Sequence, residues 1–261
     1  MRNHPRTDFR KRTAGPFLGV EGLGVVFGGT TVFAGVSFEC MPGGIAGIVG
    51  PNGCGKTTLL NVISGFLRPA AGVVAYYGEE LSPVSPLGVA RAGLGVARSF
   101  QTAFAVGGMS VLDNVVVGRR HTGEGVSGLI RSAMGRDEGE SSLRRQARLL
   151  LEALGLASAE GMLCGRLSTG QRRRVDIARA IFSGAQLLLL DEPFANLDAE
   201  TAVTVAQLLR SLAEKGRSIV IVEHRGEILG SISDQTVRFT EGGPPLVEQC
   251  RGPSPSLRLS C

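Results

Sequence analysis

The segment GPNGCGKT at residues 50–57 has the residue types and spacing of a phosphate-binding loop. It matches the pattern G-x-x-x-x-G-K-[ST], in which glycines let backbone N–H groups curl around phosphate oxygens. Lys56 could then reach the β- and γ-phosphates of a nucleotide, and the Thr57 hydroxyl could bind Mg²⁺. The alternative is a glycine turn that opens an ordinary helix. Lysine is scarce in this chain, which has only Lys11, Lys56 and Lys215, and that scarcity favours the phosphate site.

Two consecutive carboxylates, Asp191 and Glu192, follow the apolar run LLLL at residues 187–190. A strand that ends in Asp is where an enzyme with such a phosphate loop holds Mg²⁺. Glu192 could orient and deprotonate an attacking water, a role worth about 10²–10⁴-fold in rate. Read alone, the pair could also be two solvated carboxylates at a strand end, because such pairs are common surface features. Downstream of a phosphate loop, it predicts a metal ligand and a general base.

Short apolar runs and helical patterns alternate along the chain and supply the elements that must position these groups. Residues 44–49 (GIAGIV) predict a buried strand before the glycine loop, and residues 56–64 predict the helix after it. The runs at 187–190 and 219–222 enclose a helical pattern, as a parallel sheet requires. This alternation predicts an α/β protein with a nucleotide-binding sheet core.

Other segments predict parts outside that core. Residues 20–40 and 73–77 are strand candidates, the first with a Gly-Gly turn. Residues 85–165 are more helical, with apolar side chains at i, i+4, i+7, i+8 and i+11 across 143–154. The sheet core is therefore expected to be interrupted by a helical insertion.

Composition excludes several classes of protein. Most of the formal net charge of +5 lies in residues 1–12, which hold five basic residues and one Asp. The rest of the chain is close to neutral, so its charge does not indicate a nucleic-acid-binding surface. The apolar runs are far shorter than the roughly 18–20 residues of a membrane-spanning helix, and no apolar stretch follows the basic N-terminus as in a signal peptide. Five cysteines without a CxxC pair predict reduced thiols in a cytoplasmic protein.

The segment LSTGQ at residues 167–171, followed by RRRVDIARA, resembles the signature of the ABC ATPases, which is usually LSGGQ. It precedes Asp191, in the order that this family uses. Read alone, Ser168 with Gln171 predicts a helix capping box, and a helix N-terminus favours anions. The resemblance covers about residues 18–243. It implies the P-loop NTPase fold, with a mostly parallel sheet core, an antiparallel β subdomain and a helical subdomain that carries the signature.

The resemblance also implies which residues bind ATP and Mg²⁺. Metal ligation falls to Thr57, Asp191 and Gln101, the last of which senses both Mg²⁺ and the attacking water. Glu192 and His224 join Gln101 as catalytic residues, His224 by contacting the γ-phosphate. The implied nucleotide-binding residues are Phe27 under the adenine, Gly50, Asn52, Gly53, Cys54, Gly55, Lys56, Thr57 and Thr58 of the loop, Ser168, Gly170 and Gln171 of the signature, and Asp198 of the loop that contacts the opposite subunit.

In the family, the signature of one subunit closes over ATP held by the partner's phosphate loop. The implied partners are a second ABC ATPase, as homodimer or heterodimer, and transmembrane permease subunits, with a periplasmic or extracellular binding protein engaged indirectly and no nucleic acid. The implied location is cytoplasmic, at the inner face of the cell membrane.

Two segments, RSFQ at 98–101 and MSVLDNV at 109–115, resemble the ATPases of importers for branched-chain amino acids or related amides and urea. An exporter or lipid-extraction ATPase, and a soluble ABC protein of translation or DNA repair, are the alternatives. A protein that binds ATP without hydrolysing it is disfavoured by Glu192 and His224. Thr169 and Arg225 depart from the family pattern.

We expect three regions along the chain. Residues 1–16 form a disordered basic tail, and residues 17–243 form the ATPase domain, with a helical subdomain at about 102–183. Residues 244–261, rich in proline, are expected to be irregular.

Overall fold

The structure is a computed structural model that describes residues 18–81, 95–99, 105–119, 138–224, 226–240 and 245–249. The basic tail at 1–16, Gln101, Arg225 and most of the C-terminal tail lie outside the described residues, so the predictions for them stay predictions.

A six-stranded sheet in the order β10-β9-β3-β8-β7-β6 forms the centre of the fold. Its strands from β9 to β6 are mutually parallel, and β10 pairs antiparallel with β9 at one edge. Because parallel strands end at the same edge, the loops after β3, β7 and β8 lie together. The bounds are β3 Ile45–Val49, β6 Val96–Arg98, β7 Leu187–Asp191, β8 Ser218–Glu223, β9 Gln235–Arg238 and β10 Leu246–Gln249.

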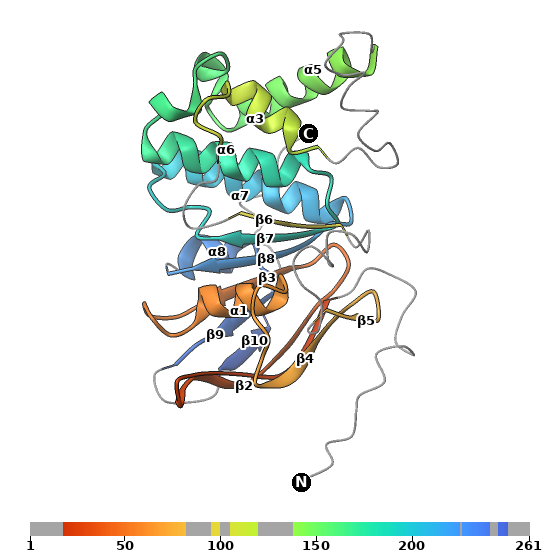
Figure 1. The fold of residues 1–261 in the computed structure, drawn as a ribbon, viewed down its shortest axis with the longest axis vertical. Coiled ribbons are helices and arrows are strands. Elements are labelled where there is room, and N and C mark those ends of the chain that lie inside the picture. Colours follow the sequence, from red (N-terminus) through yellow and green to blue (C-terminus); the bar gives the residue numbers. More distant parts are fainter. Residues whose placement is uncertain are drawn as a thin grey trace.

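A second, antiparallel sheet has the order β2-β1-β4-β5 and lies below the central sheet in Figure 1. Gly28 and Gly29 make the turn between its two long strands with φ of 53° and 84°, values that favour glycine. Its strands are β1 Leu18–Phe27, β2 Thr30–Cys40, β4 Ala71–Tyr76 and β5 Glu79–Glu80.

Helices cover both faces of the central sheet (Figure 1). Helix α1 lies between the two sheets, where Leu59 and Leu60 pack in one buried cluster with Ile48. Helices α6, α7 and α8 cover the other face, in a second cluster that includes Ile45. The alternation of β3 side chains between the two clusters is the period of a strand buried on both faces. The helix bounds are α1 Lys56–Ile63, α3 Val111–Val117, α5 Glu138–Ala153, α6 Thr169–Phe182, α7 Ala199–Glu214 and α8 Gly226–Ile232.

The helical part between β6 and β7 contains α3, α5 and α6, with short 3₁₀ helices at Ala157–Ala159 and Cys164–Arg166. The apolar face predicted across residues 143–154 is confirmed by Ala147, Leu151 and Leu154, which are fully buried. The fold class predicted from the sequence is therefore confirmed: a mostly parallel core, an antiparallel sheet and a helical part. No helix in the described part of the chain is long and apolar enough to cross a membrane.

The C-terminal segment differs from its prediction in one respect. Residues 246–249 form β10, although residues 244–261 were expected to be irregular. All four residues pair with β9, the outermost parallel strand, whose free edge offers backbone donors and acceptors to any extended segment. Leu246 and Val247 are both exposed in this strand. The strand therefore lacks a buried apolar face, which is the pattern that would indicate a strand in the sequence.

Candidate active site

The predicted phosphate loop connects β3 to α1 at the carboxyl edge of the central sheet. Gly55 precedes α1 with φ of 98°, and a Cβ there would lie 2.8 Å from side-chain atoms of both Val32 and Phe33. Only glycine fits this position, which explains the second fixed glycine of the motif. No side chain caps the N-terminus of α1. Its first N–H groups and the helix dipole are therefore available to an anion.

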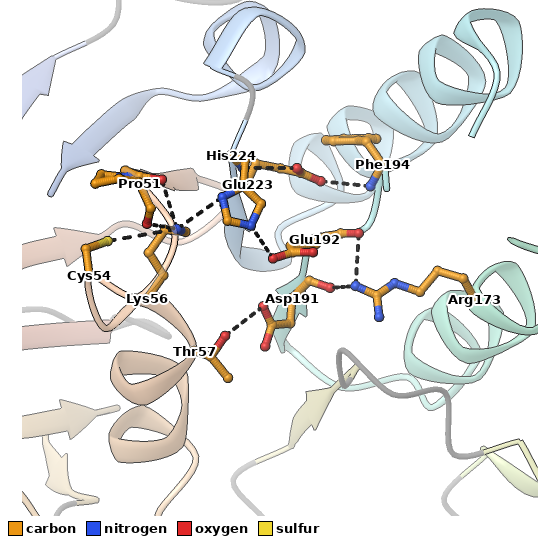
Figure 2. Close-up of polar contacts among 11 residues, drawn as sticks. Pro51, Cys54, Lys56, Thr57, Arg173, Asp191, Glu192, Phe194, Glu223 and His224 are labelled. Carbon is orange, nitrogen blue, oxygen red and sulfur yellow. Dashed lines mark hydrogen bonds and ion pairs between the residues drawn. The ribbon is translucent and has the colours of Figure 1, made fainter. Parts of the chain in front are cut away.

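The Lys56 ammonium is held across this loop and is almost fully buried. It donates hydrogen bonds to the carbonyl oxygens of Gly50 at 2.9 Å and Pro51 at 2.7 Å (Figure 2). Its Nζ also lies 3.3 Å from Nδ1 of His224. A lysine held in this way points its charge at the place where loop and helix would receive phosphate.

Thr57 and Asp191 form the candidate metal site. The Thr57 hydroxyl donates to Oδ1 of Asp191 over 3.4 Å, and Asp191 is fully buried at the end of β7. Burial raises the pKa of Asp191, an effect that the Arg98 guanidinium, 3.8 Å from Oδ2, partly opposes. Oδ2 accepts no hydrogen bond from the described residues. Two hard oxygen donors, one of them a buried carboxylate with an oxygen that accepts no hydrogen bond from the described residues, fit Mg²⁺, so the residues present suit the ion that the motif implies.

Glu192 and His224 are in direct contact. His224 Nε2 lies 2.5 Å from Oε1 of Glu192 (Figure 2). Because the ammonium of Lys56 can only donate, Nδ1 of the histidine must accept, which assigns the ring proton to Nε2. Lys56, His224 and Glu192 thus form one continuous chain of polar contacts. It brings together three residues that the sequence placed in separate motifs.

Glu223, a residue that no motif in the sequence indicated, holds the backbone on both sides of this contact. Its carboxylate accepts the backbone N–H of Phe194 at 2.8 Å and that of His224 at 3.3 Å. It is buried, and burial raises its pKa. The residue joins the loop after β7 to the loop after β8. A carboxylate as the last residue of an apolar strand was the available signal.

Arg98 and Ser99, the first two residues of the RSFQ segment, both contact Asp191. Arg98 is paired with Asp191 and also donates to the Ser64 hydroxyl at 2.8 Å. The backbone N–H of Asp191 donates to Oγ of Ser99 over 3.2 Å. Both residues therefore hold the candidate metal ligand in place.

The signature residues lie at the start of α6. Ser168 and Gln171 form the predicted capping box, each side chain bonded to the other residue's backbone. Among the described residues, neither of them hydrogen-bonds to the phosphate loop. A Cβ at Gly170 would lie 3.1 Å from the Asn196 carbonyl, so the signature packs against the loop before α7 in its own chain.

The remaining predicted residues are placed as follows. Asp198 caps α7 by accepting from Thr201, whose backbone N–H lowers the pKa of that aspartate. Phe27 is half exposed at the end of β1. Asn52 and His224 help to line an open pocket of about 450 Å³ beside the loop. Gly53, Cys54 and Thr58 lie in the loop and first turn of α1. Gln101 is outside the described residues.

The sheet, the glycine loop and the acidic residues at the end of β7 together define a P-loop NTPase. The ABC transporter family profile matches residues 33–195. The chain therefore belongs to the ABC transporter family, as an ATPase subunit.

Three curated relatives are transport proteins. BraF of Pseudomonas aeruginosa, a high-affinity branched-chain amino acid transport ATP-binding protein, is 33% identical over 233 residues, which cover 88% of this chain and 90% of BraF. LivG of Escherichia coli carries the same description and is 32% identical over the same shares. AraG of Escherichia coli, an arabinose import ATP-binding protein, is 32% identical, and the match spans 42% of AraG.

Solved structures agree with this family. The ADP conformation of MJ1267, an ATP-binding cassette of an ABC transporter, superposes with a TM-score of 0.71 at 29% identity, covering 90% of this chain and 92% of the other. The dimeric post-hydrolysis state of the cassette MJ0796, bound to ADP and Pi, gives a TM-score of 0.74 at 25% identity, covering 90% and 99%.

Proposed function

We propose that this subunit hydrolyses ATP to drive the import of branched-chain amino acids, with Glu192 as the general base. One observation carries the catalytic part of the proposal. Lys56 and Glu192 contact opposite nitrogens of the same His224 ring, at 3.3 and 2.5 Å. A phosphate-binding cation and a base therefore flank one small region at the mouth of the phosphate loop, where the γ-phosphate would lie.

The proposed reaction is an in-line displacement. A water oxygen bonds to the γ-phosphorus while the bond from that phosphorus to the β–γ bridging oxygen breaks, which leaves ADP and inorganic phosphate. Glu192 accepts the proton that the water loses. Lys56 neutralises phosphate charge, and the Nε2–H of His224 holds the carboxylate before ATP arrives and turns to the γ-phosphate afterwards.

Thr57 and Asp191 are the residues that would hold Mg²⁺. When bound, the ion would neutralise charge on the β- and γ-phosphates. Arg98 and Ser99 fix the orientation of Asp191, so the carboxylate needs little rearrangement to receive the ion. Gln101 would complete this group, as the resemblance implies.

Ser168, Gly170 and Gln171 would act on the nucleotide of a second subunit. Their capped helix start is an anion-binding end, yet Ser168 and Gln171 make no hydrogen bond to their own phosphate loop among the described residues. We infer a dimer with a second copy or a close homologue, which binds permease subunits at the inner face of the membrane. The dimeric cassette MJ0796 supports this arrangement.

The solute part of the proposal rests on BraF and LivG, which the chain matches over nearly their full length. Arabinose is the second candidate because of AraG, although the chain spans less than half of that protein. The test is transport by vesicles containing the tagged subunit and the membrane proteins that co-purify with it, with ATP enclosed on the ATPase side. ATP-dependent uptake of labelled leucine, but not of arabinose, is expected. Uptake of arabinose alone, or ATP-driven efflux of leucine, would contradict the proposal.

A further inference from the structure

Arg173 connects the signature helix to the catalytic carboxylates of its own chain. It lies in the second turn of α6 and is only 6% exposed. One terminal nitrogen of its guanidinium donates to the backbone carbonyl of Asp191 and, at 3.0 Å, to that of Glu192 (Figure 2). Hydrogen bonds from a charged donor are stronger than neutral ones. Arg173 is therefore hydrogen-bonded to the backbone of both the proposed metal ligand and the proposed base.

The backbone of Glu192, one of the two residues that Arg173 contacts, has an unusual conformation. Glu192 has φ of +52°, in the left-handed region that non-glycine residues rarely adopt. Such a conformation persists only where the surrounding structure enforces it. On one side, the Glu192 N–H donates to the Val222 carbonyl at 2.8 Å. On the other, its carbonyl accepts from Arg173 and, at 3.1 Å, from the N–H of Ala195.

We propose that Arg173 is a positioning residue that holds the Asp191–Glu192 backbone so that the Glu192 side chain meets the γ-phosphate region. The inference rests on the proposed role of Glu192 as general base. It extends that role to an arginine of the signature helix that contacts backbone carbonyls of the base and its neighbour.

The position of Arg173 on α6 has a consequence for the dimer. Ser168 caps the same helix, one turn away from Arg173. In the proposed dimer, that cap approaches the nucleotide of the other subunit. Because a helix moves as a rigid unit, a shift of its first turn moves the Arg173 guanidinium with it. Arg173 thus links engagement of the partner's nucleotide to the geometry of Glu192 in its own subunit.

The test compares Arg173→Gln with Arg174→Gln. Arg174 is the matched control because it lies on the same helix and also donates to two backbone carbonyls, those of Leu154 at 3.0 Å and Gly155 at 3.4 Å. These carbonyls belong to the helical part, away from the carboxylates. Both variants lose one charge and one set of guanidinium hydrogen bonds, so the comparison isolates where the bonds go.

For Arg173→Gln we expect turnover at saturating ATP to fall by roughly 10- to 100-fold, as for lost hydrogen bonds to a charged group. Affinity for a fluorescent ATP analogue should stay within about threefold, because the phosphate loop is intact, and Arg174→Gln should keep wild-type turnover. In a Glu192→Gln background, single-turnover hydrolysis should show no further loss from Arg173→Gln, since Arg173 acts through Glu192.

Three results would overturn the inference: wild-type turnover in Arg173→Gln, an equal loss in Arg174→Gln, or full additivity with Glu192→Gln. Should Arg173→Gln not fold, Arg173→Lys keeps the charge with a single donor nitrogen and is expected to show an intermediate turnover; wild-type turnover there would also overturn it. Failure of the wild-type protein to hydrolyse ATP with Mg²⁺ would instead defeat the proposed function itself.

Discussion

The Nε2 atom of His224 lies 2.5 Å from Oε1 of Glu192, so the proposed base is hydrogen-bonded to the histidine that follows β8. The contact joins the ends of β8 and β7, and Glu223 fixes the His224 backbone at 3.3 Å. Because the ring proton sits on Nε2, this histidine donates toward the carboxylate. The same donor becomes available to a γ-phosphate oxygen if the ring turns.

Replacing that histidine should damage turnover more than binding. We expect His224→Ala to lower turnover by about 10²-fold, the scale for losing one donor to developing charge. ATP affinity should be retained, because the loop and Lys56 remain. Phosphate release and binding of a fluorescent ATP analogue measure the two effects. A variant that hydrolyses ATP at the wild-type rate would remove His224 from the catalytic group.

Lys56→Ala should fail at an earlier step than His224→Ala. The ammonium now bonded to the Gly50 and Pro51 carbonyls is expected to transfer to phosphate oxygens, so its loss should weaken ATP binding by roughly 10- to 100-fold. Lys215→Ala is the control, because Lys215 is exposed at the end of α7. Equal ATP affinities for the two variants, measured by calorimetry, would contradict the assignment.

Cys54 should report occupancy of the phosphate loop. It is partly exposed, whereas Cys40 and Cys164 are buried and burial raises the pKa of Cys40 to about 12, which keeps that thiol inert. Maleimide should therefore label Cys54 among these three, and ATP should slow that labelling. Peptide mass spectrometry identifies the site, and Cys54→Ala, expected to be active, is the control. Full ATPase activity after stoichiometric labelling of Cys54 would show that the adduct does not block the cradle.

Glu223 gives a pH dependence of stability with a definite sign. Its pKa is raised by burial, so the folded state binds the proton more tightly than the unfolded chain does. Its contribution to stability is therefore greatest below the ordinary glutamate pKa and is lost as pH rises through the raised value. Glu223→Gln removes this titration. The difference in Tm, wild type minus variant, should decrease as the pH is raised from 4 to 8 in thermal-shift measurements. A difference that increases with pH would refute the prediction.

Contiguous motifs explain how much of the site the sequence could predict. The glycine loop, its strand and its helix are consecutive, so residues 44–64 predicted both geometry and chemistry. The same holds for the capping box of Ser168, because a capping box depends on residues three positions apart. The period of apolar residues likewise predicted the buried face at 143–154.

Contacts between distant segments could not be read in this way. Glu223 reaches Phe194 only because β7 and β8 are neighbours in the sheet, and Arg98 reaches Asp191 because β6 lies beside β7. In the sequence, Arg173 is one of three consecutive arginines. In α6 its side chain is buried, whereas that of its neighbour Arg172 is exposed. These roles follow from strand order and helix phase, which the local residue types do not specify.

Phosphate release by Glu192→Gln, measured with ATP affinity and size-exclusion mass, tests the central claim most directly. Glutamine keeps the size and hydrogen bonding of glutamate but cannot accept the proton of water, so turnover should fall by about 10²–10⁴-fold. ATP should still bind, and a dimer should accumulate because hydrolysis no longer opens it. If the variant binds ATP tightly and stays monomeric, we would infer that the partner in the dimer is a homologue and not a second copy of this chain. Wild-type phosphate release by Glu192→Gln would contradict the account.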